Sequence, residues 1–162
     1  MRVFIENKEK ADRTILQKAQ QTFWYNASYM LFYSAIVFNQ KEYADALPVV
    51  EQAARLQPSS YLFSELGECY YQVGNNEQAE QAFRKAAEMT PGYVTPHYKL
   101  FSFFRQSGQL EKAAAIAQYL LDAIYKQYGS NAIFTRQEAK DFLEMYKVSV
   151  AQHQEGGKMI GN

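Results

Sequence analysis

An internal repeat is the feature that most limits what this chain can fold into. Five residues recur after a constant offset of 33 positions: Tyr33, Ala46, Val50, Ala53 and Pro58 are matched by Leu66, Ala79, Phe83, Ala86 and Pro91. A further offset of 34 positions relates Leu66, Gly74 and Ala79 to Leu100, Gly108 and Ala113. A period of this length is typical of repeat proteins in which each unit buries its apolar face against its neighbours.

The middle copy carries the fullest pattern of spaced residues, namely Phe63, Leu66-Gly67, Tyr70, Ala79, Phe83 and Pro91. This pattern resembles the tetratricopeptide repeat, a helix-turn-helix unit of about 34 residues. The resemblance implies an all-α fold, a tetratricopeptide α-solenoid of about three helix-turn-helix repeats with flanking N-terminal and C-terminal helices. A glycine inside a helix costs about 1 kcal/mol relative to alanine. We expect the cost of Gly67 to be offset by packing, because Gly67 and Ala79 let two helices approach each other closely.

Turn and capping residues predict where the helices begin and end. The predicted helices span residues 8–25, 27–39, 43–56, 60–73, 76–89, 95–107, 110–128 and 136–152. They form a single domain, 1–153, with repeats at 27–59, 60–93 and 94–128. Thr135 and Glu138 have the spacing of a capping box, so the helix 136–152 is expected to begin there and to cap the solenoid. The glycine-containing tail 154–162 is expected to be disordered.

In tetratricopeptide folds the first helix of each repeat lines a concave groove, so projection of these helices predicts a binding surface. Aromatic residues and arginine dominate the energetics of protein interfaces, which favours this surface as a site for a protein or peptide ligand. Aromatic stripes on helices belong to the core more often than to a binding site. The last helix can also fold back onto the groove. Whether the chain itself occupies the groove is therefore left open. The predicted groove residues are Leu31, Phe38, Asn39, Tyr61, Glu68, Tyr71, Gln72, Tyr98, Arg105 and Gln106.

The charge balance and the scarcity of reactive side chains argue against nucleic-acid binding and against catalysis. Seventeen basic residues balance seventeen acidic ones, so no summed positive field attracts phosphate backbones. The one cysteine, Cys69, and the histidine His97 fall at positions expected to be packed, and His153 lies near the end of the last helix. No phosphate loop, nucleophile elbow or paired metal ligands are found in the sequence. We therefore expect no catalytic residues, no cofactor and no metal.

The sequence predicts no membrane insertion by this chain. The longest apolar stretch, Ala27 to Phe38, is shorter than the roughly 20 residues that span a bilayer. The chain is expected to be soluble as given, in the cytoplasm or the periplasm. If it is the tail of a larger protein, an anchor upstream would tether it to the inner membrane.

A second resemblance covers Ala46 to Ala113, and it is best in AEMTPGYVTPHYKLF, from Ala87 to Phe101. This stretch resembles the repeats that close bacterial O-antigen ligase-type proteins. The resemblance implies an extramembrane appendage in surface-polysaccharide assembly, and it transfers no catalytic residue. Two functions stay open: a protein-binding scaffold, or an accessory domain that positions the glycan of an attached ligase. A homodimer is also left open, because the ends of a short solenoid can pair.

Overall fold

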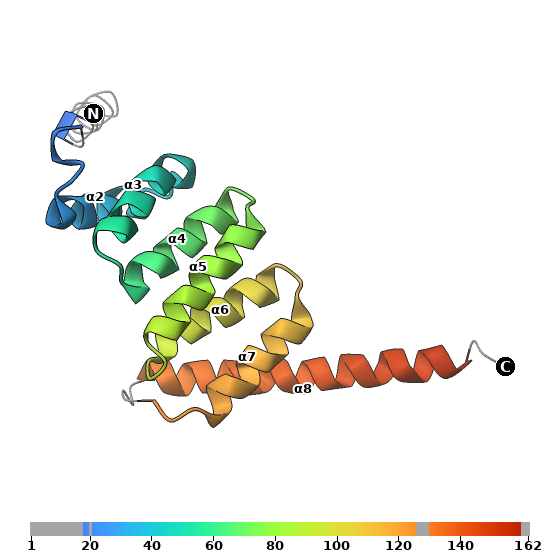
Figure 1. Cartoon of the computed structure of the whole chain (residues 1–162). Helices are drawn as coiled ribbons and strands as arrows, with labels where there is room; N and C mark the ends of the chain where they lie inside the picture. The colour runs from blue at the N-terminus through green and yellow to red at the C-terminus, as the bar shows by residue number, and fades with distance from the viewer. Residues whose placement is uncertain (1–17, 20, 126–129, 160–162) are drawn as a thin grey trace, which may run out of the picture. The chain divides into compact units, whose positions relative to one another are not determined.

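The computed structural model describes residues 18–19, 21–125 and 130–159, and its regular structure is helical throughout these ranges (Figure 1). Contacts divide the chain into two compact units, Met1–Ala79 and Glu80–Asn162, and each is described by itself. The single domain 1–153 and its repeat boundaries therefore stay predictions. The helices are α2 (Ala27–Asn39), α3 (Tyr43–Leu56), α4 (Ser60–Gln72), α5 (Asn76–Met89), α6 (Val94–Gln106), α7 (Leu110–Asp122) and α8 (Ser130–Met159).

The burial of the recurring residues confirms the register that the repeat predicts. On the second helix of each hairpin, the residues at the repeated positions have exposed fractions of 2% or less. In the third copy Ala117 stands 34 positions after Phe83, and Leu120 stands 34 positions after Ala86. The full set is Ala46, Val50, Ala53, Ala79, Phe83, Ala86, Ala113, Ala117 and Leu120. On the first helices, Tyr33, Leu66 and Leu100 are also buried. The residues that recur in the sequence are thus core residues of each hairpin, and the small ones lie where helices approach one another.

The turn inside each hairpin has the same backbone conformation in all three copies. Gly74 and Gly108 have φ angles of 84° and 74°, in the left-handed region that glycine enters without strain. The corresponding residue of the first hairpin is Lys41, which has φ 60°. The repeated fold therefore imposes a left-handed turn even where the sequence supplies no glycine.

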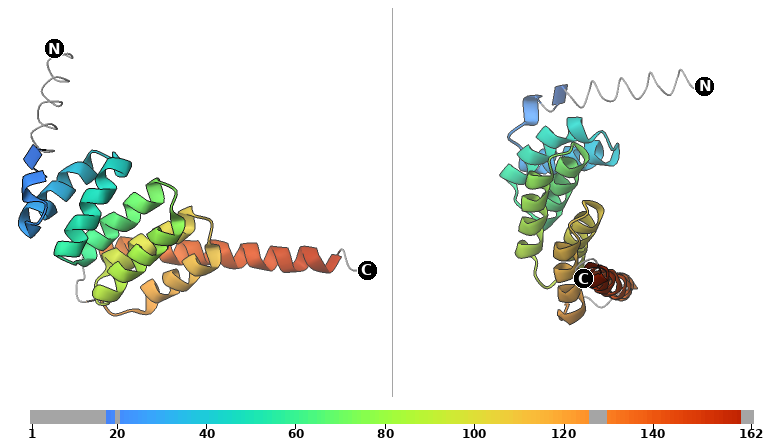
Figure 2. Two further views of the ribbon diagram at one scale, coloured as in Figure 1. Left: turned by 45° about the horizontal axis from the view of Figure 1, so that its top comes forward. Right: turned by 90° about the vertical axis from the view of Figure 1, so that its right-hand side faces the viewer.

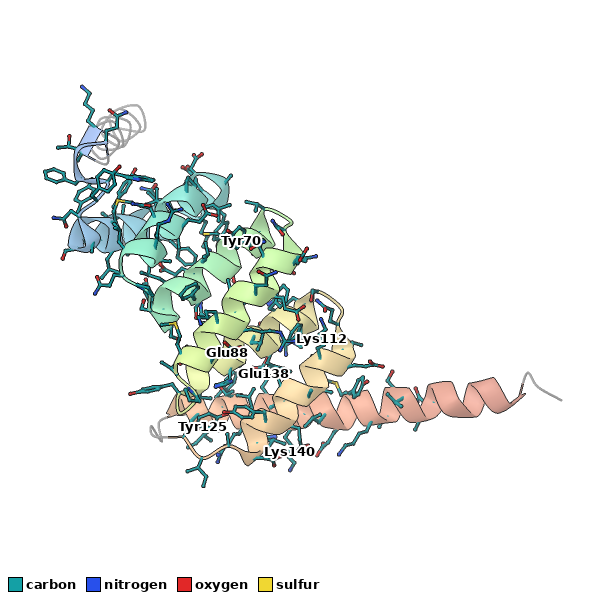
Figure 3. All side chains as sticks on the ribbon, in the orientation of Figure 1. Tyr70, Glu88, Lys112, Tyr125, Glu138 and Lys140 are labelled. Atoms are coloured by element: carbon teal, nitrogen blue, oxygen red, sulfur yellow. The ribbon has the colours of Figure 1, made fainter. Side chains whose placement is uncertain are left out.

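In the first unit, α3 packs against both α2 and α4. Helix α2 begins after Asn26, whose side-chain oxygen accepts a hydrogen bond from the Tyr29 amide at 2.9 Å. The Tyr70 hydroxyl on α4 donates to Glu51 on α3 at 2.5 Å, and this tyrosine lies near the far end of α4 (Figure 3). Of the predicted helix 8–25, residues 18–19 and 21–23 are helical and Trp24–Tyr25 form a turn, while the remainder lies outside the described residues.

In the second unit, α6 and α7 form a hairpin, and α8 packs against both of its helices. The Phe101 ring of α6 meets the Phe142 ring of α8 edge to face, with centroids 5.2 Å apart. Beyond this contact α8 continues past the ends of α6 and α7, as the left view of Figure 2 shows. Among the described residues, no helix is both long and apolar enough to cross a bilayer.

The end predicted for the helix at 110–128 is wrong. Helix α7 ends at Asp122, six residues before the predicted end at residue 128, and Ala123 has an extended backbone. The Arg136 guanidinium donates to the Ala123 carbonyl at 2.6 Å and lies 5.6 Å from the centroid of the buried Tyr125 ring. These tertiary contacts hold Ala123 and Tyr125 outside the helix, and no local sequence pattern predicts them. Residues 126–129 lie outside the described part of the chain.

The predicted capping box at Thr135 and Glu138 is also wrong. Helix α8 begins at Ser130, so Thr135 lies inside the helix and is buried. The helix runs on to Met159, through most of the tail that was expected to be disordered; residues 160–162 lie outside the described residues. Two glycines weaken a helix by about 1 kcal/mol each, which lowers its stability without ending it.

Candidate binding surface

The ten residues predicted to line a groove come from α2, α4 and α6, and their surroundings differ between the two units. On α2, Leu31 and Phe38 are half-buried and Asn39 is exposed. The Phe38 ring packs edge to face on Tyr43, with centroids 5.8 Å apart. Part of this aromatic surface is therefore already used inside the first hairpin.

On α4, Tyr61 combines exposure with a fixed orientation. Its side chain is 53% exposed, although its hydroxyl is hydrogen-bonded to the buried carboxyl of Glu65, one turn further along the helix. Partial burial, followed by this hydrogen bond, raises the pKa of Tyr61 to about 12. The phenol stays neutral at physiological pH, and its ring is presented to solvent as an anchored apolar face.

The other predicted residues of α4 form a polar edge beside this ring. The Gln72 side-chain amide donates to Glu68 at 2.8 Å, four residues apart on one helix face. Tyr71 is half-buried and Gln72 is exposed. An aromatic ring with amide and carboxylate groups along the same helix suits a ligand that offers both apolar and hydrogen-bonding groups.

On α6, Tyr98 and Arg105 are held by a side chain that the sequence did not assign to this surface. The Tyr98 hydroxyl donates to one carboxylate oxygen of Glu138 on α8 at 2.8 Å, and Arg105 donates to the other at 2.6 Å. The Arg105 guanidinium also lies 5.4 Å from the Phe101 ring centroid. Burial and then the Glu138 carboxylate raise the pKa of Tyr98. Figure 3 labels Glu138 where α8 passes beside this hairpin.

Helix α8 thus takes up part of the predicted surface, which is the alternative that the sequence left open. It engages two of the predicted residues, whereas Gln106 remains exposed and bonds to Ser102 on its own helix at 3.0 Å. The role of Glu138 was missed because its spacing from Thr135 fits a capping box. Only the tertiary position of α8 reveals that the carboxylate faces Arg105.

The histidine that the sequence placed in the core is packed there. His97 is 8% exposed, its ring lies 4.6 Å from the Tyr119 ring, and it is hydrogen-bonded to the Pro91 carbonyl. Burial lowers the pKa of His97. Cys69 is fully buried, and burial raises its pKa to about 12, which keeps the thiol protonated and unreactive. Within the described ranges, no cluster of three or more His, Cys, Asp or Glu residues could hold a metal ion.

Comparisons with known proteins point to one kind of fold. A family model described as tetratricopeptide repeat matches residues 60–93, which is the middle copy of the repeat. No curated protein matches the chain.

Solved structures agree with the family match at low sequence identity. One titled "Crystal structure of MamA" is 17% identical with a TM-score of 0.62, and the alignment covers 88% of this chain and 87% of that one. Another, titled "MamA RS-1 ArsTM double mutant", is 21% identical with a TM-score of 0.60, covering 72% of this chain and 67% of that one. Similarity at these identities establishes the fold and leaves the function to be argued from the surface.

Proposed function

Because the chain has the all-helical fold of a tetratricopeptide-repeat α-solenoid, we propose that it is a non-catalytic scaffold that binds a protein or peptide ligand on the first helices of its repeats. The observation that carries the proposal is Tyr61, an aromatic ring 53% exposed whose hydroxyl is fixed by Glu65. A side chain that is already oriented loses little conformational entropy when a ligand covers it, which makes it a good anchor.

The ligand surface we propose is smaller than the one predicted from the sequence. It consists of the α2 and α4 residues Leu31, Phe38, Asn39, Tyr61, Glu68, Tyr71 and Gln72. Tyr98 and Arg105 are left out because both are bonded to Glu138. Replacing Arg105 would loosen α8 as well as change the surface, so that substitution is a poor test of ligand binding.

The experiment is a selection of displayed peptides against the folded chain, followed by calorimetric titration of the selected peptide. We expect a dissociation constant near the micromolar level, about −8 kcal/mol. Tyr61→Ala should weaken binding at least about tenfold, or about 1.4 kcal/mol, as loss of an interface anchor does. The matched control is Tyr25→Ala, which removes a tyrosine that is 85% exposed and lies outside the proposed surface. Equal affinity of Tyr61→Ala and the parent chain would refute the proposed surface.

A finer proposal concerns surface-polysaccharide assembly, and it rests only on the resemblance of Ala46 to Ala113 to O-antigen ligase-type repeats. Under it the chain is an extramembrane tail that holds a partner protein of the assembly system. The alternative is that the tail positions a glycan, since the exposed ring of Tyr61 can stack on a sugar. Titration of purified polysaccharide separates the two: binding that Tyr61→Ala abolishes favours the glycan, and binding of peptide alone favours the scaffold.

A further inference from the structure

The two helices that carry the proposed ligand surface have charge of one sign only. Helix α2 contains no charged residue, and the only charged residues of α4 are Glu65 and Glu68. Neither helix contains a lysine, an arginine or a histidine. Because the chain as a whole balances seventeen basic residues against seventeen acidic ones, this negative charge is a local property of the surface.

The acidic side chains lie on the same side of α4 as the exposed ring of Tyr61. Tyr61, Glu65, Glu68 and Gln72 follow one another at spacings of four, three and four residues, which places them along one face of the helix. Glu65 is buried and holds the Tyr61 hydroxyl, whereas Glu68 is half-buried and therefore within reach of a ligand. Glu68 accepts its hydrogen bond from the neutral amide of Gln72, at 2.8 Å, so the bond leaves its charge in place.

The charge of Glu68 also acts on the aromatic part of the surface. Burial, followed by the Glu68 carboxylate, raises the pKa of Tyr43, whose ring packs on Phe38 of α2. No cation among the described residues offsets this rise, whereas Arg105 partly offsets the rise in the pKa of Tyr98 in the second unit. A ligand with a positive charge would therefore neutralise a potential that the described residues leave uncompensated.

The chain itself shows what kind of group occupies a charged face of a first helix. Helix α6 has the opposite charge to α4, since its charged residues are Lys99 and Arg105. Arg105 stands 34 positions after Tyr71, so it lies at the corresponding place in its repeat. The group that meets it is the carboxylate of Glu138 on α8, 2.6 Å from the guanidinium. The basic face thus receives an acidic side chain, and by the same chemistry the acidic face of α4 suits a basic one.

We propose that the ligand of this surface is a basic peptide segment, in which a lysine or arginine pairs with Glu68 and a neighbouring apolar side chain covers the ring of Tyr61. The inference rests on the proposed function, because it names the chemistry of the ligand bound at that same site. Tyr61 supplies the apolar anchor, and Glu68 selects the charge. An acidic peptide would meet Glu68 with like charge, and a neutral peptide would cover the carboxylate without supplying a cation.

The probe is the peptide selected by display on the folded chain, titrated by calorimetry after one substitution at a time. Peptides whose binding depends on Tyr61 should contain at least one lysine or arginine. Replacing the basic residue that pairs with Glu68 by glutamine should raise the dissociation constant about fivefold or more, as loss of a half-buried charge pair does. Raising the NaCl concentration from about 50 mM to about 500 mM should weaken binding of the selected peptide more than binding of the glutamine peptide.

Substitutions in the protein test the same pair from the other side. Glu68→Gln should weaken binding of the selected peptide by a similar factor and change binding of the glutamine peptide little, because the pair is already broken there. Glu68→Lys should reverse the preference, so that a peptide with glutamate at the basic position binds more tightly than the selected peptide. The matched control is Glu88→Lys, which makes the same change of charge at an exposed residue of α5 outside the proposed surface and should keep the preference for the basic peptide.

The outcomes separate this inference from the proposed function. If Tyr61→Ala weakens binding of the selected peptides, but these peptides carry no basic residue or keep their preference with Glu68→Lys, the ligand is a peptide of another chemistry and this inference alone is overturned. If no selected peptide depends on Tyr61, the proposed surface is wrong and the inference is overturned with it. Far-UV circular dichroism checks that each variant keeps its helices, and the substitutions in the peptide leave the protein unchanged.

Discussion

The three hairpins share a left-handed turn, and this predicts opposite changes in stability at two of the turns. Glycine in place of Lys41 should stabilise the fold, and alanine in place of Gly108 should destabilise it. Lys41, with φ 60°, stands where the later repeats have Gly74 and Gly108. A left-handed conformation costs an ordinary L-residue roughly 1 to 2 kcal/mol. Glycine removes this strain, but it also gives the unfolded chain about 0.4 to 1 kcal/mol more conformational entropy to lose on folding. The difference predicts that Lys41→Gly raises the free energy of unfolding by about 0.5 to 1 kcal/mol.

The reverse change at Gly108 should lower the free energy of unfolding by a similar amount. A Cβ atom built at Gly108 meets no other described atom within 4 Å, so Gly108→Ala introduces backbone strain without a steric clash. The effect should be about 1 kcal/mol, the cost of the left-handed conformation less the gain from a stiffer unfolded chain. Lys41→Ala is the control, because it removes the lysine side chain and keeps the strain, and it should change stability little.

Urea unfolding followed by far-UV circular dichroism measures all three changes, as shifts of the midpoint at constant slope. The reasoning predicts a higher midpoint for Lys41→Gly, a lower one for Gly108→Ala and an unchanged one for Lys41→Ala. If Lys41→Gly were neutral or destabilising while Gly108→Ala behaved as expected, the first turn would not carry the strain that its φ angle implies. Shifts of the same sign in both variants would refute the shared-turn argument.

Two further predictions concern the second unit. The Arg105–Glu138 ion pair has one side chain 37% exposed and the other 20% exposed. A double-mutant cycle of Arg105→Ala and Glu138→Ala should therefore give a coupling free energy of only about 0.5 to 1 kcal/mol. A coupling near zero would mean that this ion pair does not help to hold α8 in place. Burial holds the pKa of His97 below its ordinary value of 6.5, so the unfolded chain binds a proton there more readily than the folded one. The contribution of neutral His97 to the free energy of unfolding is therefore fully present above pH 6.5. It is lost as the pH falls from 6.5 through the lowered pKa of the folded state. His97→Phe should flatten this part of the melting-temperature profile, and an unchanged profile would show that other groups cause any acid sensitivity.

The repeat was enough to predict the helical hairpins, because it records contacts that recur at every period. Residues such as Val50, Phe83 and Ala117 occupy one structural position in three copies, and each is buried. Helices α2 and α3 have the predicted bounds, and α4 ends within one residue of its prediction. Where the chain leaves the period, after α7, the prediction fails at the end of α7 and at the start of α8. There the conformation depends on single tertiary contacts, such as that between Arg136 and the Ala123 carbonyl.

The binding surface was less predictable than the fold because projection onto a helix shows which side chains point outward and does not show what meets them. Tyr61 and Tyr98 both lie on the first helices, yet Tyr61 presents an exposed ring and Tyr98 bonds to Glu138. The difference arises from α8, which packs against the last hairpin and supplies a carboxylate at the point where Tyr98 and Arg105 converge. The last repeat of a repeat protein has an apolar face with no following repeat, so a capping helix must cover it. Here the capping helix bonds to residues of α6 that would otherwise be available to a ligand. In this chain the middle and last helical hairpins are therefore expected to differ in function: α8 occupies part of the face of α6, and the ligand surface is concentrated around Tyr61.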